Sequence, residues 1–188
     1  LDHNATTPCD PGVVRAMLAY FSEEFGNAAS RTHAFGFRAD AAVERARAQV
    51  AALVGADPRE IVFTSGATEA NNLALLGAAR AQHRASGGKR DHVVSCRTEH
   101  RAVLDPCLAL EREGFRVTLL GVDGDGLVDP ERLRAALEPR TALVSIMHAN
   151  NEIGVIQPIA ELGEICREAG VIFHVDAAQA TGKVDIDL

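Results

Sequence analysis

The chain has 188 residues, of which 47% are hydrophobic and 24% are charged, a composition typical of a globular protein. Its formal net charge of −7 argues against nucleic acid or an anionic membrane surface as the partner. No apolar run reaches the length that a membrane-spanning helix needs, so we expect no membrane association.

The first third of the chain is predicted to hold one long helix. Residues 25–36 show no hydrophobic period and are predicted to form a loop. A helix rich in alanine and arginine is predicted over residues 38–54, and Gly55 suits its carboxyl end because glycine adopts the left-handed conformation there.

From about residue 60 onwards, apolar strand-like runs alternate with helical patterns. The predicted strands are 61–64, 92–96, 116–122, 142–147 and 171–175, and the predicted helices are 67–84, 102–113, 130–137 and 159–169. Strands that alternate with helices indicate βαβ units and right-handed crossovers. The sequence therefore predicts an α/β fold, with a mostly parallel sheet and helices on both faces.

The four cysteines show neither a CxxC pair nor a spacing typical of zinc sites; they are Cys9, Cys96, Cys107 and Cys166. With no recognisable export signal, we expect reduced thiols and a cytoplasmic protein. Cys96 ends a predicted strand and Cys166 lies on a predicted helix, so both are interpreted as small buried hydrophobic residues.

Polar side chains follow the predicted strands at the points where ligands bind in such sheets. The run 61–64 enters the turn Ser65-Gly66, and a helix begins at Ala67 and Thr68. Unsatisfied N–H groups at a helix start favour a phosphate, to which the Thr68 hydroxyl can add a hydrogen bond. The alternative is a capped helix without a ligand. The spacing matches neither a P-loop nor GxGxxG, so a nucleotide is not supported.

Two further strand ends carry a histidine and a pair of amides. His100 follows the strand 92–96 by a short turn, where it can stack on an aromatic ring and move a proton near neutral pH. Its alternative is a helix-capping or surface histidine. Asn150 and Asn151 follow the strand 142–147, and we expect at least one of these amides to contact a ligand.

Asp176 and Gln179 follow the last predicted strand, 171–175. An aspartate that faces a pyridine nitrogen keeps it protonated, so that the ring withdraws electrons from a substrate, and a glutamine amide can donate to a phenolic oxygen. Together with a phosphate-binding helix start, these groups predict a site for pyridoxal 5'-phosphate (PLP). His174 and Asp176 share a strand face, which permits a metal site, but no third ligand stands at a suitable spacing.

Several segments together resemble a cysteine desulfurase of the iron–sulfur-assembly and nitrogen-fixation branch, within the class V PLP-dependent aminotransferases. The resemblance runs from Leu1 to Leu188 and rests on Asp2-His3-Asn4-Ala5-Thr6-Thr7-Pro8, Phe25-Gly26-Asn27, residues 30–36, Thr64 to Asn72, Glu99-His100, residues 150–154 and His174 to Gln179. It implies the PLP-dependent transferase fold type I. Residues 1–36 would hold active-site and dimer loops, and residues 37–188 would form part of the large PLP-binding domain.

The resemblance also implies a reaction and its partners. L-cysteine would give L-alanine and an enzyme-bound persulfide, whose sulfur passes to an acceptor or iron–sulfur scaffold protein, and the enzyme would be a homodimer. Ala67 and Thr68 are similar to the family's contact with the cofactor phosphate. His100 is similar to the residue that stacks on the cofactor ring and moves protons around the substrate thiol.

Three more positions match family residues with a role at the cofactor. Asp176 is similar to the partner of the pyridine nitrogen, and Gln179 to the donor to the ring oxygen. Asn151 is similar to a residue near the cofactor and the substrate carboxylate.

The family's cofactor-binding lysine has no counterpart in this sequence. Lys89 lies in a predicted loop, and Lys183 matches a different family position. On the resemblance, that lysine and the persulfide cysteine are expected beyond Leu188, so the chain would correspond to the first half of such an enzyme and be inactive alone. The alternative is a truncated, non-catalytic module for PLP binding or dimerisation.

Overall fold

The structure is a computed structural model that describes residues 3–4 and 6–186. Asp2 and Ala5 of the opening motif, and Leu188, lie outside the described residues. The chain divides into two compact units, one of residues 64–180 and one of residues 1–63 with 181–188. The functional division at residue 36, expected from the family resemblance, stays a prediction.

A parallel sheet of four strands forms the centre of the unit 64–180. Its spatial order is β2 (Arg116–Leu120), β1 (His92–Cys96), β3 (Thr141–Ser145) and β4 (Ile172–His174), and all neighbours pair in parallel. The chain first extends the sheet from β1 to β2 and then returns to add β3 on the other side of β1. The switch in direction therefore lies between β1 and β3, and ligands bind at the carboxyl ends of strands at such a point.

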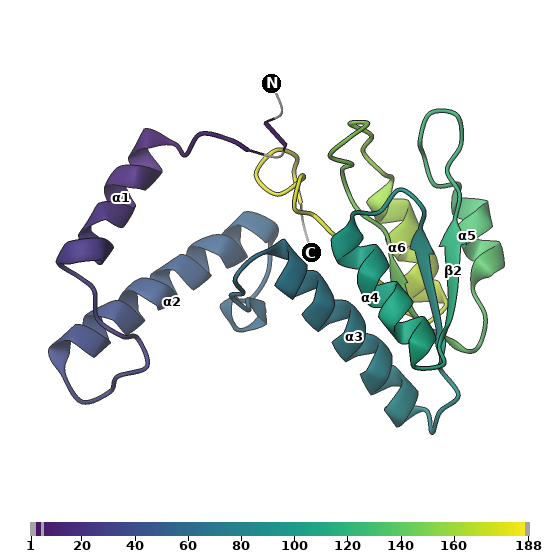
Figure 1. Cartoon of the computed structure of the whole chain (residues 1–188), viewed down its shortest axis with the longest axis horizontal. Coiled ribbons are helices and arrows are strands. Elements are labelled where there is room, and N and C mark those ends of the chain that lie inside the picture. Colours follow the sequence, from purple (N-terminus) through teal and green to yellow (C-terminus); the bar gives the residue numbers. More distant parts are fainter. Residues whose placement is uncertain (1–2, 5, 187–188) are drawn as a thin grey trace. The chain divides into compact units, whose positions relative to one another are not determined.

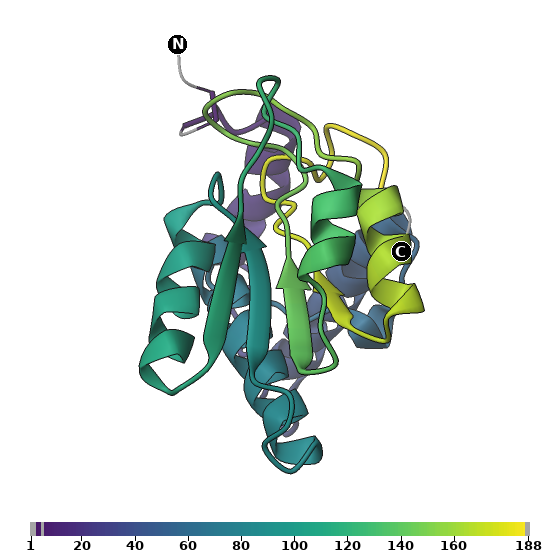
Figure 2. The same ribbon diagram turned by 90° about the vertical axis from the view of Figure 1, so that its right-hand side faces the viewer.

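Two helices cover each face of this sheet. The core contacts place α3 (Ala67–Ala85) and α4 (Arg101–Arg112) on one face, and α5 (Pro130–Ala136) and α6 (Ile159–Glu168) on the other. Figure 1 shows α4 and α5 on opposite sides of β2. Figure 2, turned by 90°, presents the strands side by side. The predicted α/β class, with a parallel sheet covered on both faces, is confirmed.

Alternating strand residues divide the core into two apolar clusters. Val93 and Leu143 pack with residues of α3 and α4, whereas Val94 and Val144 pack with residues of α5 and α6. Because successive side chains of a strand point to opposite faces, both faces of β1 and β3 are apolar and covered. This is the physical reason for the continuous apolar runs in the sequence.

The predicted boundaries in this unit are confirmed to within about two residues. Asp129 caps α5 by accepting a hydrogen bond from the Glu131 N–H at 2.9 Å, and Gly170 follows α6 with a φ of 62°.

The prediction of a strand at 61–64 is wrong. The segment has no strand partner among the described residues, and the Ile61 carbonyl accepts a hydrogen bond from the Arg47 guanidinium instead.

The unit of residues 1–63 and 181–188 is mainly helical in its described part, with α1 (Pro11–Ser22), α2 (Ala34–Val54) and the short 3₁₀ turn η1 (Pro58–Glu60). The sequence analysis missed α1, although Asp10 before Pro11 is a recognisable start signal: its carboxylate accepts a hydrogen bond from the Gly12 N–H at 2.6 Å. Across residues 3–4 and 6–186, no helix is long and apolar enough to cross a membrane.

One buried histidine lies at the amino end of the sheet. His92 is 0% exposed, and its two ring nitrogens lie 2.9 Å from the hydroxyls of Thr141 and Thr118. Burial lowers the pKa of His92 from its ordinary 6.5, and the nearby Arg116 acts in the same direction. The folded protein therefore holds this ring neutral.

The free energy of unfolding is expected to fall as the pH is lowered from neutrality through 6.5, because the unfolded chain then binds a proton that the buried His92 ring resists. Replacing His92 with glutamine should reduce this decline, measured by urea unfolding between neutral pH and about pH 5. Exposed His3 provides the matched control, since His3→Gln should retain the full decline. Equal pH slopes for the wild type and His92→Gln would contradict the assignment.

Candidate functional site

Asp176 is a buried carboxylate just beyond the end of β4. It is 7% exposed, and its Oδ2 accepts a hydrogen bond from Asn71 Nδ2 at 2.8 Å. Its Oδ1 accepts from the Ala178 N–H at 3.0 Å, while its backbone carbonyl accepts from the His148 N–H at 2.9 Å. A carboxylate has about four acceptor positions, so both oxygens keep capacity for a further donor.

The start of α3 is linked to Asp176 through Asn71, which lies one turn after Ala67 and Thr68. Gly66 is the N-cap residue of α3, and within residues 3–4 and 6–186 no side-chain cap hydrogen bond is made at this helix start. A Cβ added to Gly66 would meet nothing within 4 Å, so there is open space beside the N-cap residue. The structure therefore brings a helix start suited to an anion and a buried carboxylate into one connected arrangement.

His100 occupies the N-cap position of α4 and is exposed. Its Nδ1 accepts a hydrogen bond from the Ala102 N–H at 3.0 Å. In the neutral ring the proton therefore resides on Nε2. The helix-capping interpretation of His100 holds, and it leaves Nε2 available to a ligand.

Glu99 is a residue of this edge that sequence reasoning missed. It is 6% exposed, and its Oε1 accepts a hydrogen bond from the Met147 N–H at 2.6 Å. Burial raises its pKa to about 8; the hydrogen bond from Met147 opposes that rise, and the charge of Asp176 adds to it. The position of Glu99 between a predicted strand end and His100 could have marked it as a candidate site residue. Its burial could not be predicted from the sequence.

The two asparagines after β3 have different surroundings. Buried Asn150 donates from Nδ2 to the Thr98 carbonyl at 2.8 Å, and its Oδ1 accepts from the N–H groups of Glu152 and Ile153 at 2.8 and 3.0 Å. Its amide is thus used to shape the loop. Asn151 is only half-buried, so it remains the candidate for a ligand contact.

Gln179 lies half-buried in the turn after Asp176, which the Ala180 N–H closes by donating to the Ala177 carbonyl at 2.9 Å. His174 Nδ1 lies 2.8 Å from Ser145 Oγ on the neighbouring strand, and burial lowers its pKa. The described residues contain no group of three side chains that could hold a metal ion.

Three of the four cysteines are unsuited to act as nucleophiles, and Cys9 is exposed in the other unit. Cys96, Cys107 and Cys166 are buried, which confirms the interpretation of Cys96 and Cys166 as small hydrophobic residues. Burial raises the pKa of the Cys107 and Cys166 thiols to about 11, so they are thiols rather than thiolates at neutral pH.

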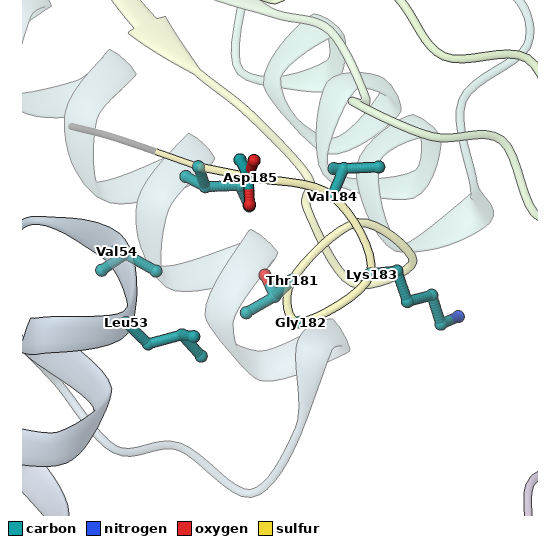
Figure 3. Close-up of a pocket in the computed structure, with 8 residues that line it drawn as sticks. Leu53, Val54, Thr181, Gly182, Lys183, Val184 and Asp185 are labelled. Atoms are coloured by element: carbon teal, nitrogen blue, oxygen red, sulfur yellow. The ribbon is translucent and has the colours of Figure 1, made fainter.

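The two lysines of the chain lie in different units. Lys89 follows the carboxyl end of α3, about 28 Å along that helix from its start. Lys183 belongs to the other unit, beside a cavity of about 230 Å³ whose wall includes Leu53 and Val54. Figure 3 shows the Lys183 amine directed away from those two side chains.

Comparison with known proteins places these residues in a family. The sequence matches the "Aminotransferase class-V" family over residues 1–188. Cysteine desulfurase IscS of Dechloromonas aromatica is 63% identical across all of this chain and 46% of its own length. The cysteine desulfurase of Mus musculus is 56% identical across all of this chain and 40% of its own length.

Solved structures agree with the sequence relatives. A NifS-like protein superposes with a TM-score of 0.93 at 39% identity, over all of this chain and 50% of its own. SspA in complex with cysteine gives a TM-score of 0.93 at 39% identity, over 99% of this chain and 52% of its own. The chain spans about half the length of the relatives it matches. The match over its whole length shows that the chain belongs to the class V aminotransferase family of PLP-dependent enzymes, with cysteine desulfurases among its relatives.

Proposed function

We propose that this protein acts as a PLP-dependent cysteine desulfurase, which converts L-cysteine to L-alanine and a protein-bound persulfide. The observation that carries the proposal is the buried Asp176 carboxylate, linked through Asn71 at 2.8 Å to the open start of α3. The similarity to cysteine desulfurases supports the choice of reaction within the family.

The residues at this edge fit PLP in charge and in hydrogen-bonding capacity. The free N–H groups of the first turn of α3, with the Thr68 hydroxyl, suit a phosphate. Asp176 offers unused acceptor positions to a protonated pyridine nitrogen. Gln179 carries a side-chain amide of the type that donates to a ring oxygen. His100 presents an exposed imidazole that can lie on the ring. When bound, PLP withdraws electrons from the Cα of an amino acid.

Each residue then has a defined task in the reaction. Asp176 keeps the pyridine nitrogen protonated by placing a negative charge beside it. His100 moves a proton at the substrate thiol through Nε2, because Nδ1 is held by the Ala102 N–H. Asn151 contacts the cofactor and orients the substrate carboxylate.

The sulfur transfer balances without an external oxidant or reductant. The C–S bond of L-cysteine breaks, its Cβ gains a proton to give L-alanine, and the sulfur forms an S–S bond with a cysteine thiolate of the enzyme. We assign the carrier to none of Cys96, Cys107 and Cys166, which are buried. Delivery to a sulfur acceptor or iron–sulfur scaffold protein, a homodimeric state and a cytoplasmic location belong to the same proposal.

The function itself is tested on the protein as its source organism makes it, incubated with PLP and L-cysteine, by measuring alanine and persulfide. The 188 residues by themselves contain no counterpart of the family's cofactor-binding lysine and are expected to form no alanine. Alanine formed in equal amount to the sulfur transferred is expected. PLP binding without alanine would instead support the alternative of a non-catalytic module, and the absence of both would overturn the proposal.

Replacing Asp176 with asparagine is expected to weaken PLP binding about 10- to 100-fold, because a charge-assisted hydrogen bond contributes about 1.5–3 kcal/mol. The affinity is measured by absorbance titration of the full chain with PLP. Asp105→Asn, on the exposed surface of α4, is the matched control and should bind PLP as the wild type does. Unchanged affinity in Asp176→Asn would remove Asp176 from the cofactor site.

Replacing His100 with asparagine separates its two roles. Asparagine is a good N-cap residue, so α4 should keep its start while Nε2 is lost. The rate of alanine formation is expected to fall by about 10²- to 10⁴-fold, the usual contribution of a proton-transferring side chain. His83→Asn, near the carboxyl end of α3, should retain the wild-type rate. A rate that stays within about threefold in His100→Asn would limit His100 to helix capping.

A further inference from the structure

The end of β3 lacks a strand partner on one side. Along β3, the N–H groups of Ile146 and His148 donate to the carbonyls of His174 and Asp176, at 3.1 and 2.9 Å. The N–H of Met147, between them, points to the opposite side, because successive N–H groups of a strand alternate in direction. β1 lies on that side but ends at Cys96.

The Glu99 side chain takes the place of the missing strand at this point. Its Oε1 accepts from the Met147 N–H at 2.6 Å, so a carboxyl group closes the gap between the carboxyl ends of β1 and β3. This gap is the switch point of the sheet, where a ligand is expected. Glu99 also directly precedes His100, and its anchoring fixes the backbone from which that imidazole projects.

The second oxygen of Glu99 is buried without a partner. Among residues 3–4 and 6–186, no hydrogen bond and no ion pair reaches its Oε2. An ionised carboxylate in this position would be a buried charge without a counter-ion, which is strongly unfavourable in a protein interior.

The titratable groups that face Glu99 favour its neutral form. Asp176, beyond β4, places a negative charge nearby, and Cys107 of α4 is itself affected by the Glu99 charge. Of the two carboxyl groups, Asp176 receives two donors, from Asn71 and Ala178, whereas Glu99 receives only the Met147 N–H. Because two nearby acids in a buried site rarely ionise together, the better-solvated one keeps the charge.

We propose that Glu99 is a positioning residue whose carboxyl group carries a proton in the folded protein, which leaves Asp176 as the ionised member of the pair. A neutral Glu99 holds the end of β3 and the backbone of His100 without adding a second negative charge beside Asp176. The role of Asp176 toward a pyridine nitrogen rests on the proposed function, but the protonation of Glu99 does not.

The first test is a carbon-13 NMR titration of the side-chain carboxyl groups in the full chain without PLP. The Glu99 resonance, identified by its loss in Glu99→Gln, is expected to titrate near the pKa of about 8 given above. The Asp176 resonance should show a step at the same pH, and this step should vanish in Glu99→Gln. A Glu99 resonance that titrates near its ordinary value of 4.5 would overturn the proposal. If Glu99→Gln does not fold, the Glu99 carboxyl resonance of the wild type can be assigned by correlation with the backbone signals of the same residue. Its titration then tests the proposal without the variant.

The second test uses the pH dependence of stability. Between 4.5 and about 8, the folded protein holds a proton on Glu99 that the unfolded chain has lost, so this residue makes stability fall as the pH rises. Glutamine mimics the protonated carboxyl and does not titrate. The melting temperature of Glu99→Gln minus that of the wild type should therefore increase by about 5 °C or more as the pH rises from 5 to 8. Exposed Glu161→Gln should run parallel to the wild type, and a Glu99→Gln curve that also runs parallel would refute the proposal.

Glu99→Ala distinguishes positioning from simple burial. It leaves the Met147 N–H unpaired, so it should lose stability at every pH, whereas Glu99→Gln restores the acceptor. Restoration by glutamine but not by alanine is expected; equal loss in both variants would contradict a neutral Glu99. These measurements need neither PLP nor cysteine, so they test the protonation of Glu99 independently of the proposed function. Either proposal can be refuted while the other is supported.

Discussion

A carboxylate loses hydration worth several kcal/mol when it enters a protein interior, and it stays ionised there only if donors replace the water. Asp176 meets this requirement with the Asn71 amide and the Ala178 N–H. The first donor ties α3 to the end of β4, and the second forms the turn that carries Gln179. The need to solvate one buried charge thus determines how the helix start and the strand end approach each other.

The second constraint is the separation of β1 from β3 at the switch point. Parallel strands that part leave N–H and carbonyl groups without partners, and buried groups of this kind must be satisfied. The Glu99 carboxyl accepts from the Met147 N–H, and the Asn150 amide donates to the Thr98 carbonyl. Side chains therefore replace the strand pairing where β1 and β3 part, so the backbone groups stay satisfied there.

His100 shows how one residue serves both the fold and the chemistry. Its Nδ1 satisfies an N–H of the first turn of α4, which also selects the tautomer with the proton on Nε2. Helix capping and proton transfer had stood as alternatives for this residue. The two roles are compatible, because Nδ1 accepts the capping hydrogen bond while Nε2 can take part in proton transfer.

Sequence patterns alone predict the α/β class and the strands 92–96 and 142–147 to within two residues. They also predict that His100, Asn151, Asp176 and Gln179 follow strand ends. These features are local: periodicity, caps and turn residues depend on neighbours a few positions away. The helix α1 was also readable, since Asp10 and Pro11 mark its start.

The burial of each polar group and the identity of its partner follow from the three-dimensional packing and could not be predicted from the sequence. Asn71 and Asp176 are 105 residues apart in sequence, and Glu99 meets Met147 across 48 residues. The packing also decides that residues 61–64 form no strand in the described chain, since a strand exists only where another pairs with it. Burial and long-range pairing arise from the packing of whole elements, so they cannot be predicted from residue propensities or local motifs.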